Sequence, residues 1–161
     1  MPKIVLTTEI HATPDLCFDL SRSIDLHKIS TAHTNEEAIA GTTSGLINLH
    51  QTVTWQATHF GVKQLLTSKI TAFDRPHSFT DEQTKGIFKS FKHIHQFEKV
   101  GDQTMMTDIF EFQSPFGLLG HIFNRLILTR YMKKLLTDRN HFIKAFAETD
   151  QWREVIQESK D

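Results

Sequence analysis

The residues from Gly86 to Pro115 constrain the fold most, because they form two alternating segments joined by one short turn. The turn is Val100-Gly101-Asp102-Gln103, and glycine at its first central position favours a type II′ turn between antiparallel strands. Pairing Val100 with Gln103 fixes the register. One face then carries the pairs Phe97–Met106, His95–Asp108, His93–Phe110 and Phe91–Phe112. The other carries Glu98–Met105, Gln96–Thr107, Ile94–Ile109 and Lys92–Glu111. The sequence therefore predicts a sheet whose apolar face holds a polar spot.

Size and charge narrow the class of protein. A chain of 161 residues fits one domain, and 18 basic against 19 acidic side chains leave a net charge of −1. This balance argues against a nucleic-acid or anionic-membrane partner. Cys17 is the single cysteine, so no internal disulfide can form, as is usual in a reducing cytoplasm. We expect neither a signal peptide nor a membrane span, because no apolar run approaches about 18 residues. The sequence thus predicts a cytoplasmic protein.

The first forty residues predict a strand and two short helices. Residues 3–11 alternate in polarity, as in a half-buried strand. A helix should follow, with Thr13 as its N-cap and Pro14 at its first position. A second short helix is expected from Ile24 to Ser30, and a weaker strand from Asn35 to Ala40.

A second hairpin is expected from Gln51 to Phe73, with His59 paired to Val62. Its inward face should carry Val53, Trp55, Ala57, His59, Val62, Leu66 and Ile70. A short strand from Ser78 to Thr84 follows, and its Asp81-Glu82-Gln83 run places one acid inward in either register.

One long helix is predicted at the end of the chain, because residues 116–147 contain no proline. Apolar residues recur there at spacings of three and four, at Leu119, Ile122, Phe123, Leu126, Leu128, Tyr131, Leu135, Phe142 and Phe146. Trp152 and Ile156 would continue this stripe to the C-terminus. The basic residues of the segment are expected on a solvated face: Arg125, Arg130, Lys133, Lys134 and Arg139.

This order of elements resembles the SRPBCC superfamily, which includes START lipid-transfer domains, the major birch-pollen allergen and polyketide cyclase/dehydrase-like proteins. The similarity lies in three stretches: residues 11–20 (HATPDLCFDL), residues 52–61 (TVTWQATHFG), and residues 81–97 with DEQ, GIF and HIHQF. The last two are similar to an uncharacterised bacterial subgroup. Many relatives carry Trp near the end of the second small helix, where this chain reads Leu26-His27-Lys28-Ile29-Ser30.

The resemblance implies an α+β helix-grip fold, in which a curved antiparallel sheet wraps around the long C-terminal helix. One domain would span residues 1–161, with a core over about 3–148 and a helical extension over 149–161. An elongated cavity between sheet and helix is expected to bind a small hydrophobic molecule. The family has no universal catalytic motif, and fold alone does not establish a function.

The residues expected to line the cavity come from both layers. The sheet would contribute Trp55, His59, Leu66, Phe91, Phe97, Phe110 and Phe112, and the helix Ile122, Phe123 and Leu126. His93, His95 and Asp108 would form a polar anchor. The first interpretation is a hydrogen-bonded His–Asp pair, the second a ligand-orienting group, and the third an acid–base or zinc centre.

The leading hypothesis is therefore intracellular binding or carriage of a lipid- or polyketide-like ligand, with no cofactor and no metal ion. One alternative is a cyclase- or dehydratase-type enzyme that uses His95 and Asp108 as the base and Glu82 or Asp81 as the acid. Another is an interaction protein whose 13 phenylalanines fill its own cavity. A homodimer is compatible with the sequence, but nothing in the sequence requires one.

Overall fold

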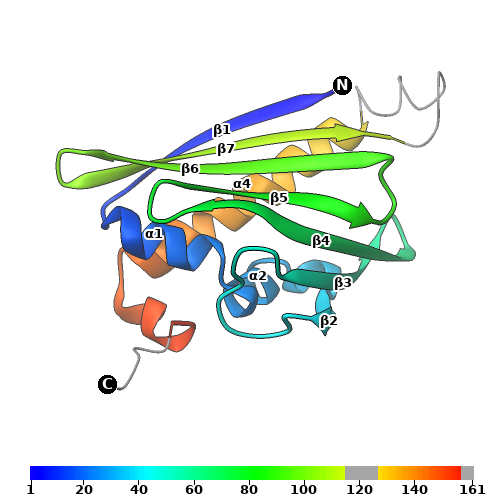
Figure 1. Cartoon of the computed structure of the whole chain (residues 1–161), viewed down its shortest axis with the longest axis horizontal. Coiled ribbons are helices and arrows are strands. Elements are labelled where there is room, and N and C mark those ends of the chain that lie inside the picture. The colour runs from blue at the N-terminus through cyan, green and yellow to red at the C-terminus, as the bar shows by residue number, and fades with distance from the viewer. Residues whose placement is uncertain (115–126, 157–161) are drawn as a thin grey trace.

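A seven-stranded antiparallel sheet forms the body of the molecule, and helices lie along one side of it (Figure 1). The computed structural model describes residues 1–114 and 127–156. The strand order is β1-β7-β6-β5-β4-β3-β2. The strands are β1 Lys3–Ile10, β2 Glu37–Gly41, β3 Thr52–His59, β4 Val62–Asp74, β5 Ser78–Lys85, β6 Ser90–Val100 and β7 Gln103–Gln113. The helices are α1 Pro14–Ser21, α2 Ile24–Ser30, η1 Ala32–Thr34, α4 Thr129–Ala147 and η3 Asp150–Glu154. Helix α4 packs against β1, α1 and α2.

The register predicted for the β6–β7 hairpin is confirmed over its whole length. Val100 pairs with Gln103, and His95 lies directly opposite Asp108. Gly101 has φ +64°, a left-handed conformation that costs glycine little and that a type II′ turn requires at this position. Alternate residues of β6 from Phe91 to Phe97 are buried, so the predicted apolar face points into the molecule.

Local capping explains where the first two helices begin. Thr13 Oγ1 accepts a hydrogen bond from the backbone N–H of Leu16 at 3.3 Å, and α1 starts at Pro14 as predicted. Ser23 Oγ accepts from the backbone N–H of Leu26 at 3.2 Å and so starts α2. The second helix matches its predicted bounds, Ile24 to Ser30.

The β3–β4 hairpin also has the predicted register, with His59 opposite Val62. The predicted inward face is buried at Val53, Trp55, Ala57 and Ile70. His59 and Leu66 are half-buried, and Val62, beside the turn, is 58% exposed.

Helix α4 differs from the prediction in its buried face. Phe142 is 38% exposed, whereas Arg139 and Asn140 are buried together with Leu136 and Ile143. Spacings of three and four connect these buried positions, so the helix turns a mixed polar and apolar face to the sheet. The prediction that Arg139 lies on a solvated face is therefore wrong.

The predicted continuation of this helix beyond residue 148 is not found over residues 149–156, and residues 157–161 lie outside the described residues. Helix α4 ends at Ala147, and Thr149 is extended with φ −133° and ψ 178°. Thr149 Oγ1 accepts from the backbone N–H of Gln151 at 3.3 Å, which starts the separate 3₁₀ helix η3. A threonine cap thus interrupts the apolar repeat that joined Phe146 to Trp152. The predicted helix start falls within residues 115–126, outside the described residues.

Two apolar clusters fill the space between the sheet and the helices. One surrounds Phe18 of α1, whose ring makes edge contacts with Phe73, Phe79 and Phe97 at centroid distances of 5.1, 5.2 and 5.4 Å. The other is made of Ile4, Phe88, Phe91, Phe110, Phe112, Leu128 and Leu136. Along β6, Phe91 belongs to one cluster and Phe97 to the other, so His93 and His95 lie between them.

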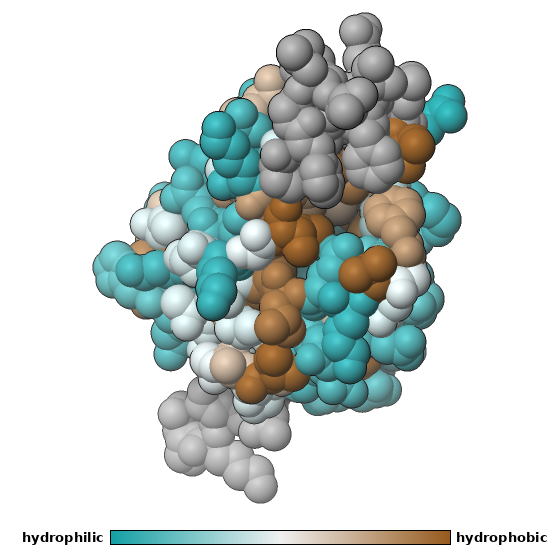
Figure 2. All heavy atoms as spheres, turned by 90° about the vertical axis from the view of Figure 1, so that its right-hand side faces the viewer, coloured by the Kyte–Doolittle hydropathy of each residue, from teal (hydrophilic) through white to brown (hydrophobic). Residues whose placement is uncertain are grey.

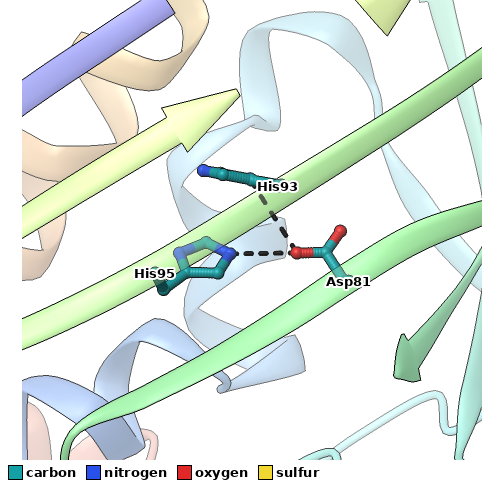
Figure 3. A group of neighbouring side chains, drawn as sticks. All are labelled: Asp81, His93 and His95. Carbon is teal, nitrogen blue, oxygen red and sulfur yellow. Dashed lines mark hydrogen bonds and ion pairs between the residues drawn. The ribbon is translucent and has the colours of Figure 1, made fainter. Parts of the chain in front are cut away.

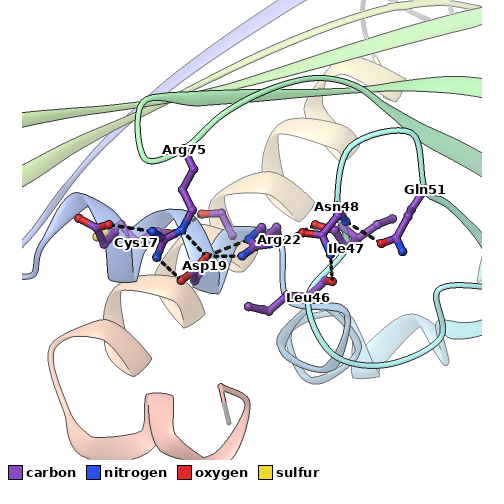
Figure 4. A network of polar contacts seen from close by, with 10 residues as sticks. Cys17, Asp19, Arg22, Leu46, Ile47, Asn48, Gln51 and Arg75 are labelled. Atoms are coloured by element: carbon purple, nitrogen blue, oxygen red, sulfur yellow. Dashed lines mark hydrogen bonds and ion pairs between the residues drawn. The ribbon is translucent and has the colours of Figure 1, made fainter. Parts of the chain in front are cut away.

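Charged side chains tie α1 to the turn between β4 and β5 (Figure 4). Arg75 of that turn donates to Asp15 Oδ1 at 3.0 Å and to Asp19 Oδ2 at 2.6 Å. Arg22 donates to Asp19 Oδ1 at 2.9 Å and to Asn48 Oδ1 at 2.7 Å. This network holds α1 against the β4–β5 turn and against the loop that contains Asn48. No helix in the described part of the chain is both long and apolar enough to cross a bilayer.

Candidate functional site

A cavity of about 190 Å³ lies between the sheet, α2 and α4. Apolar side chains make up most of its wall: Ile24, Ile47, Val53, Trp55, Ile70, Phe79, Ile87, Phe88, Phe91, Phe110, Leu128, Met132, Leu135 and Leu136. Two of its lining residues reach the surface, Phe60 with 56% and Ile87 with 36% of its area exposed. These two exposed residues mark the mouth of the cavity. Figure 2 shows a band of apolar side chains between hydrophilic ones at the end of the molecule that lies on the right in Figure 1.

Asp81, His93 and His95 form a polar group on the cavity wall (Figure 3). Asp81 of β5 is paired with His93 of β6, and His95 lies two residues further along the same face. Asp81 Oδ1 is 2.9 Å from His95 Nε2 and 3.9 Å from His93 Nδ1. Burial opposes ionisation of Asp81, but the hydrogen bond with His95 and the nearby His93 outweigh it and lower the carboxyl pKa.

Asp108 lies behind the two imidazoles and is fully buried. Its Oδ1 is 2.9 Å from His93 Nε2 and 3.0 Å from His95 Nδ1, and its Oδ2 accepts from Asn140 Nδ2 at 2.7 Å. Burial would raise its pKa, but His93 and His95 beside it outweigh burial and hold the pKa well below its usual range. Asp108 is therefore an anion that can only accept hydrogen bonds, so His93 Nε2 must be the donor in their contact.

Arg139 of α4 supplies the fixed positive charge of this cluster. Its Nη2 donates to the backbone carbonyl of Ser21 at 2.7 Å, and its Nη1 lies 3.7 Å from Asp108 Oδ1. Burial and the neighbouring His95 lower the pKa of His93, which keeps that imidazole neutral. The buried cluster thus holds two carboxylates against one guanidinium.

A second polar group lies near the mouth of the cavity. His59 Nδ1 is 2.7 Å from the Tyr131 hydroxyl, and the Phe60 ring packs against Tyr131 at a centroid distance of 4.6 Å. Burial lowers the pKa of His59 and raises that of Tyr131. On the α2 side, His27 lies 3.2 Å from Glu36. Burial opposes ionisation of Glu36, but His27 outweighs it and lowers the pKa of the carboxyl group.

The structure brings six of the residues predicted for the site to the cavity wall: Trp55, His59, Phe91, His93, His95 and Phe110. Phe97 and Phe112 do not line it, because their rings pack into the two apolar clusters on either side. Leu66 is half-buried against one of these clusters, and Asp108 lies behind the histidines. Ile122, Phe123 and Leu126 lie outside the described residues.

Of the two acids proposed on β5, Asp81 faces the cavity and Glu82 does not. Glu82 pairs with Lys69 on one side and Lys92 on the other, on the face away from the cavity. The expected His95–Asp108 pair is also more complex. His95 Nδ1 is close to Asp108 but makes no hydrogen bond, while His95 Nε2 is hydrogen-bonded to Asp81. Asp108 is instead hydrogen-bonded to His93.

Sequence reasoning missed Arg139, Tyr131, His27 and Glu36 as cavity residues. The signal for Arg139 was present, because Leu136, Arg139 and Ile143 follow one another at helical spacing. His27 and Glu36 had no such signal, since α2 and the residue that precedes β2 meet only in the folded chain.

Comparison with known proteins supports the architecture. No family description and no curated protein matches the sequence. Among solved structures, protein TTHA0849 from Thermus thermophilus aligns with a TM-score of 0.70 at 14% identity, over 91% of this chain and 99% of that one. Ginseng major latex-like protein 151 from Panax ginseng gives 0.65 at 16% identity, over 92% and 98% of the two chains. Protein CV1439 from Chromobacterium violaceum gives 0.68 at 8% identity, over 93% and 100%.

The chain has a helix-grip fold. The fold predicted from the order of elements is thereby confirmed, together with the likeness to the SRPBCC type. Because the identities are so low, these structures do not transfer a ligand or a reaction, and function has to be argued from the cavity.

Proposed function

We propose that the protein binds a small, largely apolar molecule in the cavity between the sheet and α4. The observation that carries this proposal is an apolar chamber of about 190 Å³ with polar groups at its wall and its mouth. Apolar cavities of about 150 Å³ bind a molecule as large as benzene. The volume therefore favours a polyketide-like ligand of one or two rings over a long lipid chain. Mostly apolar walls with a few fixed polar groups are typical of ligand sites.

The polar groups give the ligand an orientation. An apolar ring can pack against Trp55, Phe91 and Phe110, while a hydroxyl or carbonyl group meets the His59–Tyr131 pair or the Asp81–His93–His95 wall. Such groups are already ordered by their own contacts, so binding would cost little side-chain entropy.

Two observations count against the alternatives. A cyclase- or dehydratase-type reaction needs a base with an imidazole nitrogen open to the substrate, but both ring nitrogens of His95 lie within 3.0 Å of a carboxylate oxygen. A cavity filled by the protein's own side chains is disfavoured, because about 190 Å³ exceeds the space of a few waters. Binding is therefore the function that the geometry supports best.

Thermal unfolding with a panel of one- and two-ring compounds tests the proposal. A ligand at a hundredfold excess over its dissociation constant adds about 2.7 kcal/mol of stability, or about 5–10 °C in midpoint for a chain of this size. Trp55 lies on the cavity wall, so its fluorescence should change with the same concentration dependence.

Two variants on neighbouring residues of β4 make the test specific. Ser68 is buried on the cavity wall, and Ser68→Phe should fill the chamber and remove the response. Thr67 points to the opposite face of the same strand, so Thr67→Phe should leave the response unchanged. If no compound shifts the midpoint, or if Ser68→Phe responds like the unaltered protein, binding in this cavity is ruled out.

A further inference from the structure

The protons of the buried polar cluster do not match its contacts. A neutral imidazole has one N–H, yet each histidine faces two carboxylate oxygens. His95 lies 2.9 Å from Asp81 and 3.0 Å from Asp108. His93 lies 2.9 Å from Asp108 and 3.9 Å from Asp81. Only two of these four contacts are hydrogen bonds, His93 Nε2 with Asp108 and His95 Nε2 with Asp81, and His95 Nδ1 is left buried without a partner 3.0 Å from Asp108 Oδ1.

Asp108 offers a second place for the His95 proton. One oxygen of Asp108 lies 2.9 Å from His93 Nε2 and 3.0 Å from His95 Nδ1. His93 Nε2 already donates to it, and with the His95 proton moved from Nε2 to Nδ1, His93 Nδ1 and His95 Nε2 would both present lone pairs. Both of these nitrogens face the same oxygen, Asp81 Oδ1. Three electron-pair donors thus converge, and a cation between them would relieve their repulsion.

The spacing of the three donors suits a metal ion. Their atoms all lie within 4.8 Å of one another. A tetrahedral zinc ion with bonds of about 2.0–2.1 Å separates its ligand atoms by roughly 3.3 Å. The distances of 2.9 and 3.9 Å to Asp81 Oδ1 lie on either side of that value, so small side-chain rotations would seat an ion.

We propose that Asp81, His93 and His95 bind a divalent first-row metal ion, with the remaining coordination position open to the cavity. Two imidazoles and one carboxylate are a donor set that zinc and its neighbours accept. Asp108 would hold both imidazoles from behind, as second-shell carboxylates do in metal sites. Asn140 fixes Asp108 in turn, by donating to its other oxygen at 2.7 Å.

The charge of the cluster points the same way. Two carboxyl groups, Asp81 and Asp108, lie in the cluster, while Arg139, 3.7 Å from Asp108 Oδ1, is the one guanidinium within ion-pair distance of them in the described part of the chain. A buried charge without a partner is costly, and a bound cation would add positive charge where the carboxyl groups outnumber the guanidinium.

Titration of the chelator-stripped protein with Co²⁺, followed by displacement with Zn²⁺, tests the site. We expect one Co²⁺ per chain with visible absorption bands of a low-coordinate nitrogen–oxygen site, and loss of these bands on adding one equivalent of Zn²⁺. Asp81→Asn should weaken binding more than 100-fold, because it removes the ligand charge. Asp108→Asn should weaken it about 10–100-fold, as is typical of second-shell changes.

A matched control lies in the same cavity. His59→Gln removes an imidazole near the mouth, outside the proposed ligand set, and should leave Co²⁺ affinity unchanged. Absence of the bands in the unaltered protein, or equal affinity in Asp81→Asn, would overturn the proposal. If Asp81→Asn fails to fold, X-ray absorption of the Zn²⁺-loaded protein decides, since fewer than two imidazole ligands also refutes the site.

Discussion

Replacing Arg139 with methionine should destabilise the protein by about 3–5 kcal/mol, the usual cost of removing one partner from a buried ion pair. The side chain is 8% exposed, and its guanidinium lies 3.7 Å from the Asp108 carboxylate. Two charges about 4 Å apart attract by about 4 kcal/mol at an effective dielectric constant near 20. The hydrogen bond from Arg139 to Ser21 adds about 1.5–3 kcal/mol for a charged donor. Desolvation of the guanidinium offsets part of this sum.

Urea unfolding in the presence of a chelator measures the change. With a slope of about 2 kcal/mol per molar urea, the midpoint should fall by about 1.5–2.5 M. Arg130→Met is the matched control, because Arg130 is on the same helix and exposed, and such a change costs less than about 0.5 kcal/mol. A cost for Arg139→Met as small as that of the control would show that Arg139 is solvated. It would refute the buried cluster described above.

Two further predictions concern α1. Burial opposes ionisation of Asp19, but hydrogen bonds from Arg75 and Arg22 outweigh it and lower its pKa below 3.8. The contribution of Asp19 to stability is therefore present above pH 3.8, and it is lost as the pH falls through the pKa of the folded state. In Asp19→Asn, the free energy of unfolding measured by urea titration should fall less steeply below about pH 4 than in the unaltered protein. An unchanged pH dependence in this range would contradict the prediction. Burial raises the pKa of Cys17 to about 11. Thiol reagents at pH 8 should therefore react with Cys17 no faster than the protein unfolds locally or globally. Rapid labelling of the folded protein would instead show an accessible thiolate.

The β6–β7 register could be read from sequence because two independent constraints agreed. A two-residue turn with glycine at its first position fixes which residues pair, and the alternation of apolar side chains fixes which face is buried. The caps at Thr13 and Ser23 act within three residues, so the starts of α1 and α2 are local properties as well. Features that depend only on residues close together in the chain can therefore be predicted from the sequence.

The polar cluster depends on contacts that are not local. The connection between β5 and β6 is longer than a two-residue turn, so sequence alone left Asp81 and Glu82 as alternatives for the inward acid. The structure decides for Asp81 by pairing it with His93. Arg139 was assigned to solvent because lysines and arginines cluster around it, yet Asp108 offers a buried counter-charge 3.7 Å away. Whether an arginine on a mixed helix is buried depends on that distant partner.

Packing alone does not account for the polar cluster. Phe91 and Phe97 show that β6 can place large apolar side chains on the same face, on either side of His93 and His95. Replacing a buried ionic group by apolar residues of similar volume is often neutral or stabilising, because desolvation consumes most of the electrostatic gain. The cluster therefore contributes something other than stability. It lies where the two apolar clusters separate and the cavity opens, so Asp81, His93 and His95 line the chamber, while Asp108 lies behind the imidazoles and is held by Asn140. That division between presenting and supporting side chains is expected of a binding site.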